Sequence, residues 1–155
     1  MSIAILGYGV VGSGAYEVLK NAGYPVSYVL DIRPHPELGD ILTNDIETIL
    51  NDPAVTVVAE AIGGNRISYD YVKRALQAGK HVVSSNKHLI CSYYKELHAL
   101  AKENGVSYLF EASVGGGIPI IRPLREDLAS NNVNAISGIL NGTTNYILTQ
   151  MRDNG

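Results

Sequence analysis

The sequence has little cysteine, no basic run and no long apolar stretch, and each absence narrows the possible functions. Its single cysteine, Cys91, excludes an internal disulfide framework, fits a reducing compartment and is predicted to be a small buried or half-buried side chain. Without a basic run or a basic-aromatic patch, nothing indicates nucleic acid as a partner. No apolar run approaches the roughly 18–20 residues of a membrane span, and Ile3–Leu6 is too short for a signal peptide. We therefore expect a cytoplasmic protein that does not bind a membrane.

Several catalytic motifs are also missing. The sequence has no cysteine–histidine cluster for zinc and no serine nucleophile elbow with histidine and acid partners. Its glycine-rich loop lacks the Gly-Lys-Ser/Thr ending that binds nucleoside triphosphates. What is present is a chain of 155 residues, 46% hydrophobic and 17% charged, with a net charge of −3. This composition is typical of a globular protein with a real core.

The first residues carry the strongest motif. A short apolar strand, Ile3–Leu6, runs directly into Gly7-Tyr8-Gly9-Val10-Val11-Gly12, and a helical pattern follows over Val10–Asn21. In a dinucleotide site the first glycine of this spacing allows the tight turn, the second lets a pyrophosphate approach the backbone, and the third lets the helix pack on the sheet. The helix N-terminus then offers unpaired N–H groups to the phosphates. The motif predicts a dinucleotide-binding loop.

The choice of cofactor depends on two residues, Asp31 and Arg33, that follow the second predicted strand, Val26–Leu30. Asp31 stands at the carboxyl end of that strand, about 20 residues after the glycines, where an acid accepts hydrogen bonds from the ribose hydroxyls of NAD. Arg33 follows two residues later and could instead meet the 2′-phosphate of NADP. We favour the ribose role for Asp31, and the choice between NAD and NADP stays open.

Strands and helices alternate along the rest of the first 132 residues. Further strands are expected at 55–62, 81–85 and 106–112, and a loop at 34–39. Four further helices are expected. One lies at 46–50, one begins after Ser68 as its cap, one lies at 93–104 with Ser92 as its cap, and one lies at 120–129. This alternation predicts an α/β fold, a Rossmann-like doubly wound parallel sheet with right-handed crossovers.

The character of the sequence changes after residue 132. Residues 134–140 look like a strand, Asn141–Asn145 is polar and turn-rich, and Tyr146–Met151 has helical spacing. We interpret residues 1–132 as the dinucleotide-binding domain and 133–155 as the first strand and helix of a truncated second domain. The alternative is a sixth strand with a terminal helix.

Three further positions attract chemical interpretations. Lys87 follows a strand at the carboxyl edge of the sheet, where ligands bind in open α/β folds, and could exchange protons or orient an anion. The glycines after Glu111, residues 115–117, could turn carbonyls towards a hard cation or N–H groups towards an anion. Glu60, inside an apolar run, is interpreted as a strand-end side chain in local hydrogen bonds rather than a catalytic group.

The chain resembles homoserine dehydrogenase over essentially its whole length. The resemblance is carried by Gly7–Gly12, Val83–Lys87, Phe110–Pro119 and Ser137–Ile147. It implies reversible oxidation of L-homoserine to L-aspartate 4-semialdehyde with NAD or NADP, on the route to threonine and methionine.

The resemblance also implies roles for individual residues. Lys87 looks like the family's catalytic lysine, which contacts cofactor and substrate and assists proton transfer. The backbone carbonyls of Glu111, Val114, Gly116 and Ile118 resemble a site for a monovalent cation, sodium. The implied cofactor-binding residues are Gly7, Tyr8, Gly9, Val10, Val11, Gly12, Asp31, Arg33, Ile62, Gly63, Gly64, Ser85, Lys87, Gly142 and Thr143.

One departure from the family limits what the resemblance implies. Family members continue well beyond this chain, with a second catalytic lysine, acidic substrate ligands and most of the dimer interface. We therefore expect the chain to bind cofactor without turnover, and expect a homo-oligomer only of the full-length protein. The alternatives are a non-catalytic dinucleotide-sensing module and another two-domain dehydrogenase or reductase of aspartate-family metabolism.

Overall fold

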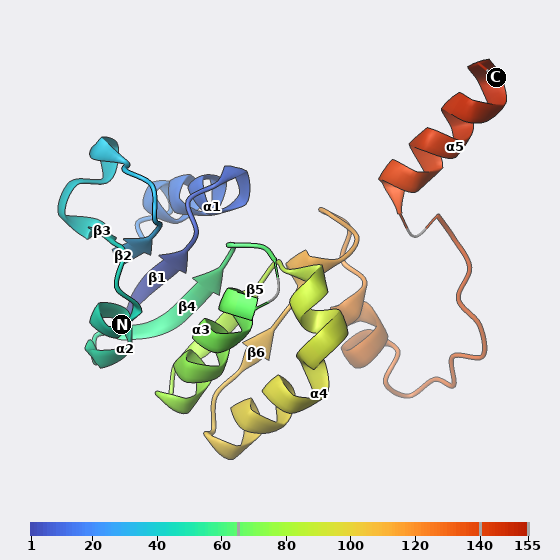
Figure 1. Ribbon diagram of the computed structural model, residues 1–155. Helices are drawn as coiled ribbons and strands as arrows, with labels where there is room; N and C mark the ends of the chain where they lie inside the picture. Colours follow the sequence, from blue (N-terminus) through green and yellow to red (C-terminus); the bar gives the residue numbers. More distant parts are fainter. Residues whose placement is uncertain (65, 140, 155) are drawn as a thin grey trace.

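A single parallel sheet organises the first two thirds of the chain. The computed structural model describes residues 1–64, 66–139 and 141–154 (Figure 1). Within them, six strands pair in the order β3-β2-β1-β4-β5-β6, and every pairing is parallel. The strands are β1 (Ser2–Leu6), β2 (Val26–Leu30), β3 (Leu42–Thr43), β4 (Val55–Glu60), β5 (His81–Ser84) and β6 (Tyr108–Leu109). This confirms the predicted Rossmann-like doubly wound sheet, with its switch point between β1 and β4.

Helices connect the strands and cover both faces of the sheet. The α-helices are α1 (Val10–Asn21), α2 (Ile46–Asn51), α3 (Arg66–Gln77), α4 (Lys87–Glu103) and α5 (Gly142–Asn154). Short 3₁₀ segments lie at Pro36–Ile41 and Glu111–Ser113, and a π-helical turn at Pro123–Asp127. In Figure 1, α3 and α4 lie on one side of the sheet and α1 on the other.

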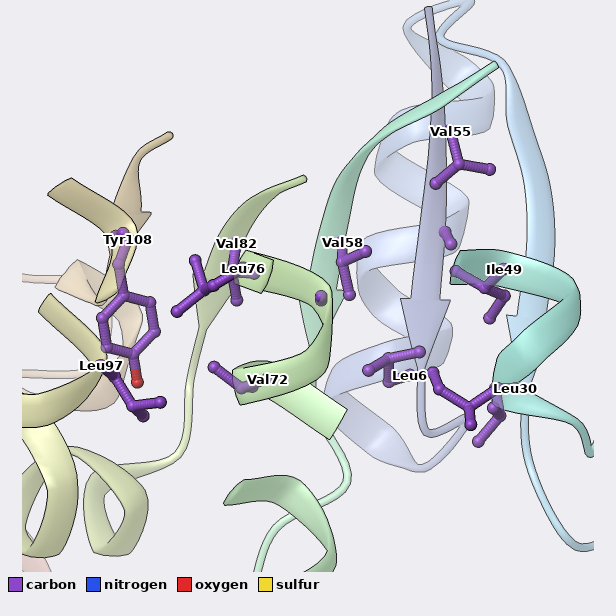
Figure 2. Packing of buried hydrophobic residues seen from close by; sticks show 14 of the residues in the cluster. Leu6, Leu30, Ile49, Val55, Val58, Val72, Leu76, Val82, Leu97 and Tyr108 are labelled. Carbon is purple, nitrogen blue, oxygen red and sulfur yellow. The ribbon is translucent and has the colours of Figure 1, made fainter. Parts of the chain in front are cut away.

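The core has two layers because successive strand residues point to opposite faces. Ala4 and Leu6 of β1 join the larger cluster with α2, α3 and α4, and the residue between them, Ile5, joins the smaller one beneath α1. Figure 2 shows the larger cluster: Leu6 and Leu30 lie beside Ile49 of α2, while other strand residues meet α3 and α4. Strand β1, buried on both faces, is therefore the rigid support for the turn at its carboxyl end.

Two helix starts differ from the prediction. Helix α4 begins at Lys87 rather than after Ser92, because Asn86 Oδ1 accepts a hydrogen bond from Leu89 N and so caps the helix. Ser68 is not a cap either; it lies inside α3, where its hydroxyl donates to the carbonyl of Gly63. The prediction that Cys91 is buried or half-buried is also wrong, since Cys91 is exposed on α4.

Several other elements also differ from the prediction in length or type. Strand 106–112 is shortened to β6, because the chain turns into a 3₁₀ segment at Glu111, and strand 55–62 ends at Glu60. The predicted loop at 34–39 contains 3₁₀ structure, and β3 adds a two-residue edge strand that was not expected. The predicted helix at 120–129 is reduced to a short helical segment with a π-helical turn.

The last part of the chain forms one of its two predicted elements. Helix α5 is present and longer than predicted, and an extended segment separates it from the sheet (Figure 1). Residues 134–139 form no strand; Leu140, the last residue of that prediction, lies outside the described residues. A strand needs a neighbour to pair its backbone groups, and no described strand of the sheet pairs with 134–139. Across residues 1–64, 66–139 and 141–154, no helix is long and apolar enough to cross a membrane.

Candidate functional site

The turn between β1 and α1 is shaped by its three glycines, each in a different way. Gly7 has a positive φ of 91°, and a Cβ on it would lie 2.9 Å from backbone atoms of Ala61. A Cβ on Gly12 would lie 1.8 Å from the carbonyl oxygen of Gly7. A Cβ on Gly9 would meet nothing within 4 Å. Gly7 and Gly12 are therefore required by the fold, whereas Gly9 leaves open space in front of the backbone.

The N-terminus of α1 opens into that space. Gly9 is its N-cap, and no side chain caps the helix. Val10 and Val11, predicted with the loop, are 93% and 56% exposed, so the first turn is accessible. Uncapped N–H groups and the positive end of the helix dipole favour an anion at this position.

Asp31 lies beside the turn with both carboxylate oxygens occupied. Oδ1 accepts from Arg33 N at 2.9 Å and Arg33 Nε at 3.1 Å. Oδ2 accepts from Tyr8 N at 2.8 Å and from a guanidinium nitrogen of Arg33 at 3.1 Å. A carboxylate has about four lone-pair positions, and all are used here. The hydrogen bonds from Arg33 hold the pKa of Asp31 well below its usual range, although burial opposes this shift.

Arg33 is the exposed partner of this pair. Its side chain is 61% exposed while that of Asp31 is 7% exposed. The carboxylate fixes one edge of the guanidinium and raises the pKa of Arg33. The remaining donors of the guanidinium therefore face solvent at the rim of the cleft, in a geometry suited to a phosphate.

A cleft of about 280 Å³ lies at the carboxyl edge of β1, β2 and β4. It brings together five of the predicted residues: Gly7, Gly9, Asp31, Arg33 and Ile62. The rest of its wall is mostly apolar, and is formed by Leu30, Ile32, Ala61, Ile67 and Tyr71. Such a wall suits a flat aromatic ring.

None of these five wall residues was predicted as a site residue, and three of them lie outside the predicted strands. Ile32 is 88% exposed and Ile67 is 50% exposed, and Tyr71 lies one helical turn beyond Ile67 on α3. The only local signal was Ile32, an apolar residue in a polar loop directly after Asp31. Ile67 and Tyr71 reach the cleft through the packing of α3, which has no signature in the sequence.

Lys87 lies just after the neighbouring strand, β5, beyond a short turn. It is the exposed first residue of α4, next to the buried cap Asn86. The Asn86 amide donates to the carbonyl of Gly64 at 2.7 Å, which ties this turn to the exposed Gly63–Gly64 loop after β4. Ser85 N donates to the carbonyl of Glu60 at 3.2 Å. Gly63, Gly64, Ser85 and Lys87 therefore lie on two adjacent, hydrogen-bonded loops at the edge that carries the cleft.

The loop predicted to bind a cation is tightly folded. Gly115 has a φ of 71°, its carbonyl accepts from Ile118 N, and a Cβ on it would lie 2.6 Å from the carbonyl oxygen of Ile118. The carboxylate of Glu111 accepts from the backbone N–H groups of residues 120–122. These bonds lower the pKa of Glu111, the one to Ile120 most. Since this carboxylate caps the following helical segment, the cation ligands predicted in this loop are its backbone carbonyls.

Two predicted residues lie away from this edge. Gly142 and Thr143 are exposed in the first turn of α5, beyond the extended segment that separates it from the sheet (Figure 1). No described cluster of three or more histidine, cysteine or acidic side chains could hold a metal ion.

Comparison with known proteins gives consistent matches. The family model described as homoserine dehydrogenase, NAD binding domain, matches residues 7–111, and the one described as homoserine dehydrogenase matches residues 119–155. A homoserine dehydrogenase of Pseudomonas aeruginosa is 40% identical; the match covers 100% of this chain and 39% of the relative. The chain thus spans well under half the length of this curated relative.

Solved structures match in the same way. A homoserine dehydrogenase from Thiobacillus denitrificans has a TM-score of 0.90 at 38% identity, covering 99% of this chain and 39% of that one. A hyperthermophilic archaeal homoserine dehydrogenase in complex with NADPH has a TM-score of 0.84 at 27% identity, covering 99% of this chain and 57% of that one.

Proposed function

The chain belongs to the homoserine dehydrogenase family, and from this we propose that its cleft binds NADP(H) for the reversible oxidation of L-homoserine to L-aspartate 4-semialdehyde by the whole protein. The single observation that best supports the cofactor site is the difference in the space around the three glycines of the turn. Gly7 and Gly12 are enclosed by backbone, whereas Gly9 faces open space at an uncapped helix N-terminus. A pyrophosphate there would receive hydrogen bonds from the first turn of α1.

Asp31 and Arg33 support NADP(H) over NAD(H). A ribose diol needs a free acceptor, and the four positions on Asp31 already hold Tyr8 and Arg33 donors. A 2′-phosphate instead needs donors, which the exposed guanidinium of Arg33 offers. On this view Asp31 orients Arg33, and the adenine lies between Ile32, Ile67 and Tyr71.

Calorimetric titration of the chain with NADPH and with NADH tests both parts of the proposal. We expect saturable binding of both, tighter for NADPH. Arg33→Ala should weaken NADPH binding by about tenfold or more and leave NADH binding within about twofold, since a charge-assisted phosphate contact contributes about 1.5–3 kcal/mol. Lys20→Ala, an exposed cation on α1, is the matched control. Absence of binding by the folded chain would contradict the cofactor site, and equal losses for both nucleotides would contradict the preference.

We assign proton transfer to Lys87 in the complete enzyme. The nicotinamide supplies a hydride acceptor, and the hydroxyl proton of homoserine must leave as the carbinol carbon is oxidised. Lys87 begins α4, where the helix dipole adds to the positive potential of its ammonium. This placement opposes helix stability, so it supports a role in binding or proton transfer. The chain alone should bind cofactor without turnover, because it spans 39% of its curated relative.

We also propose that the loop from Glu111 to Ile118 binds sodium through the carbonyls of Glu111, Val114, Gly116 and Ile118. Neutral carbonyl oxygens are donors that a hard cation prefers, and the tight turn at Gly115 fixes the loop that carries them. The thermal midpoint of unfolding should be higher in sodium chloride than in tetramethylammonium chloride at equal ionic strength. Equal midpoints would contradict the site.

A further inference from the structure

A buried carboxylate links the two loops that carry the proposed site. Glu60, the last residue of β4, is 2% exposed, and its backbone pairs with Leu6 and Ser84 of the neighbouring strands. None of the ion pairs among the described residues involves it. A buried carboxylate without a cation must be satisfied by hydrogen bonds, and the identity of its donors shows what it holds.

The first donors come from the loop directly after β4. Glu60 Oε1 accepts from Ile62 N at 3.1 Å and from Gly63 N at 3.4 Å. Ile62 lines the cleft, and Gly63 has a left-handed φ of 76°. The carboxylate therefore fixes the turn that forms one wall of the cleft.

The other donors come from the turn between β5 and α4. Ser84 Oγ, fully buried, donates to Glu60 Oε2 at 2.6 Å and accepts from Asn86 N at 3.1 Å. The Asn86 amide points to Glu60 Oε1 at 3.5 Å and Gly64 O at 2.7 Å, while its oxygen caps α4 through Leu89 N. A continuous set of hydrogen bonds thus runs from Glu60 to the helix turn that begins with Lys87.

We propose that Glu60 is a positioning residue that holds the Ile62–Gly64 loop and Lys87 in one arrangement at the cofactor edge. It acts through Ser84 and Asn86 and touches neither cofactor nor substrate. This role rests on the proposed function, because it concerns how the cleft wall and Lys87 are placed relative to one another. It depends on the reach of the side chain, since the donors on the two loops must be met at the same time.

Two substitutions of Glu60 separate the effect of side-chain length from the effect of its charge. Glu60→Asp keeps the charge and shortens the side chain by one methylene, whereas Glu60→Gln keeps the length and removes the charge. For each variant, calorimetry gives the Kd for NADPH. Acetylation followed by mass spectrometry gives the protection of Lys87 by NADPH, with the exposed Lys95 of α4 as internal reference.

We expect Glu60→Asp to raise the Kd for NADPH about tenfold and to abolish the protection of Lys87, because small misplacements of such groups are costly. Glu60→Gln should stay within about threefold of the unsubstituted chain, since its amide can still accept from Ile62 N and donate to Ser84 Oγ. Unchanged binding and protection in Glu60→Asp would overturn the positioning role. So would losses in Glu60→Gln as large as those in Glu60→Asp, because they would assign the effect to charge.

A second variant keeps the test decisive. If Glu60→Asp fails to fold, as judged by circular dichroism, Ser84→Ala is measured by the same criteria, because it removes the hydroxyl that joins Glu60 to Asn86. Glu47→Gln, which removes an exposed carboxylate paired with Arg74, is the matched control and should change neither readout. If the unsubstituted chain binds no NADPH or leaves Lys87 unprotected, the proposed function itself fails. If the unsubstituted chain binds NADPH and protects Lys87, and the variants behave in the same way, only the proposed role of Glu60 fails.

Discussion

The glycines of the β1–α1 turn and of α1 itself differ in what a methyl group would meet. At Gly12 it would overlap the carbonyl of Gly7, at Gly9 it would enter open space, and at Gly14, inside α1, it would also meet nothing within 4 Å. The G-x-G-x-x-G spacing predicts a separate role for each of its glycines. The geometry separates a residue required for packing from one that leaves room for a ligand.

Alanine substitutions should separate these roles. Gly12→Ala should lower the free energy of unfolding by about 1–3 kcal/mol through overpacking. Gly9→Ala should leave stability within about 0.5 kcal/mol and weaken NADPH binding by about tenfold or more, because the methyl group occupies the phosphate position. Gly14→Ala is the control, expected to stabilise by about 0.5–1 kcal/mol with unchanged binding. Urea titration and calorimetry measure both quantities. Unchanged binding in Gly9→Ala would contradict a phosphate at this position.

The pH dependence of stability should report the Asp31–Arg33 pair. The hydrogen bonds from Arg33 lower the pKa of Asp31 in the folded chain from its ordinary value of 3.8. Its contribution is therefore fully present above about pH 4 and is lost as the pH falls further towards the folded pKa. Asp31→Asn should cost about 1–2 kcal/mol at pH 7, and the difference should shrink below pH 4. Urea unfolding from pH 3 to pH 7 measures it, with Glu17→Gln on α1 as the exposed control. A difference that does not change with pH would contradict the pairing.

At the scale of elements, glycine and proline residues predicted the ends of helices and strands where those ends depend on the local sequence. Helix α1 and strand β2 have the predicted bounds, because Gly9, Gly23 and Pro25 mark their ends. The start of α4 was missed because Ser92 is an equally good cap by residue type. Only the fold shows that Asn86 is held in place by Glu60 and Gly64.

The parts that sequence reasoning missed depend on distant partners. The residue types at 134–139 favour a strand, but they do not show whether a neighbouring strand is there to pair with it. Tyr71 reaches the cleft only because α3 packs beside β4 and β5. Glu60 was correctly expected to make local hydrogen bonds, but its bonds to Ser84 and Asn86 cross to the next strand. Residue types and spacing thus predicted strands β1, β2, β4, β5 and β6, the glycine turn and the place of Asp31 at the end of β2. They did not predict β3, the absence of a strand at 134–139 or the contacts between elements.

A buried lysine joins two elements at the opposite, amino-terminal end of the sheet. Lys80 is 4% exposed, and its ammonium donates to the carbonyls of Asp52 and Val55 at 2.9 and 2.8 Å. Burial lowers its pKa. Lys80→Met should cost about 1–3 kcal/mol in urea unfolding, because it leaves two carbonyls without their donor, and should leave NADPH affinity unchanged. Lys95→Met, an exposed position on α4, should cost less than about 0.5 kcal/mol. Equal costs would show that the two carbonyls do not need Lys80.

At the scale of the whole molecule, the chain has a packed part and an exposed part. The buried residues of both core clusters lie between Ala4 and Tyr108. In contrast, Ile136, Ile139, Tyr146, Leu148 and Met151 are all more than half exposed. This supports our proposal that residues 1–132 form the dinucleotide-binding domain and that 133–155 belong to a second one.

Limited proteolysis should find this boundary. Exposed backbone without helix or strand pairing is cut first, and residues 128–139 are the longest such stretch among the described residues. Brief digestion with a protease of broad specificity should therefore remove α5 and leave a resistant fragment that ends between residues 128 and 139. Because the described residues that line the cleft all lie between Gly7 and Tyr71, the fragment should keep the NADPH affinity of the intact chain within about threefold. A tenfold weaker fragment would mean that Gly142 and Thr143 contribute to cofactor binding as the family resemblance implies. Early cleavage within α3 or α4 would contradict the boundary.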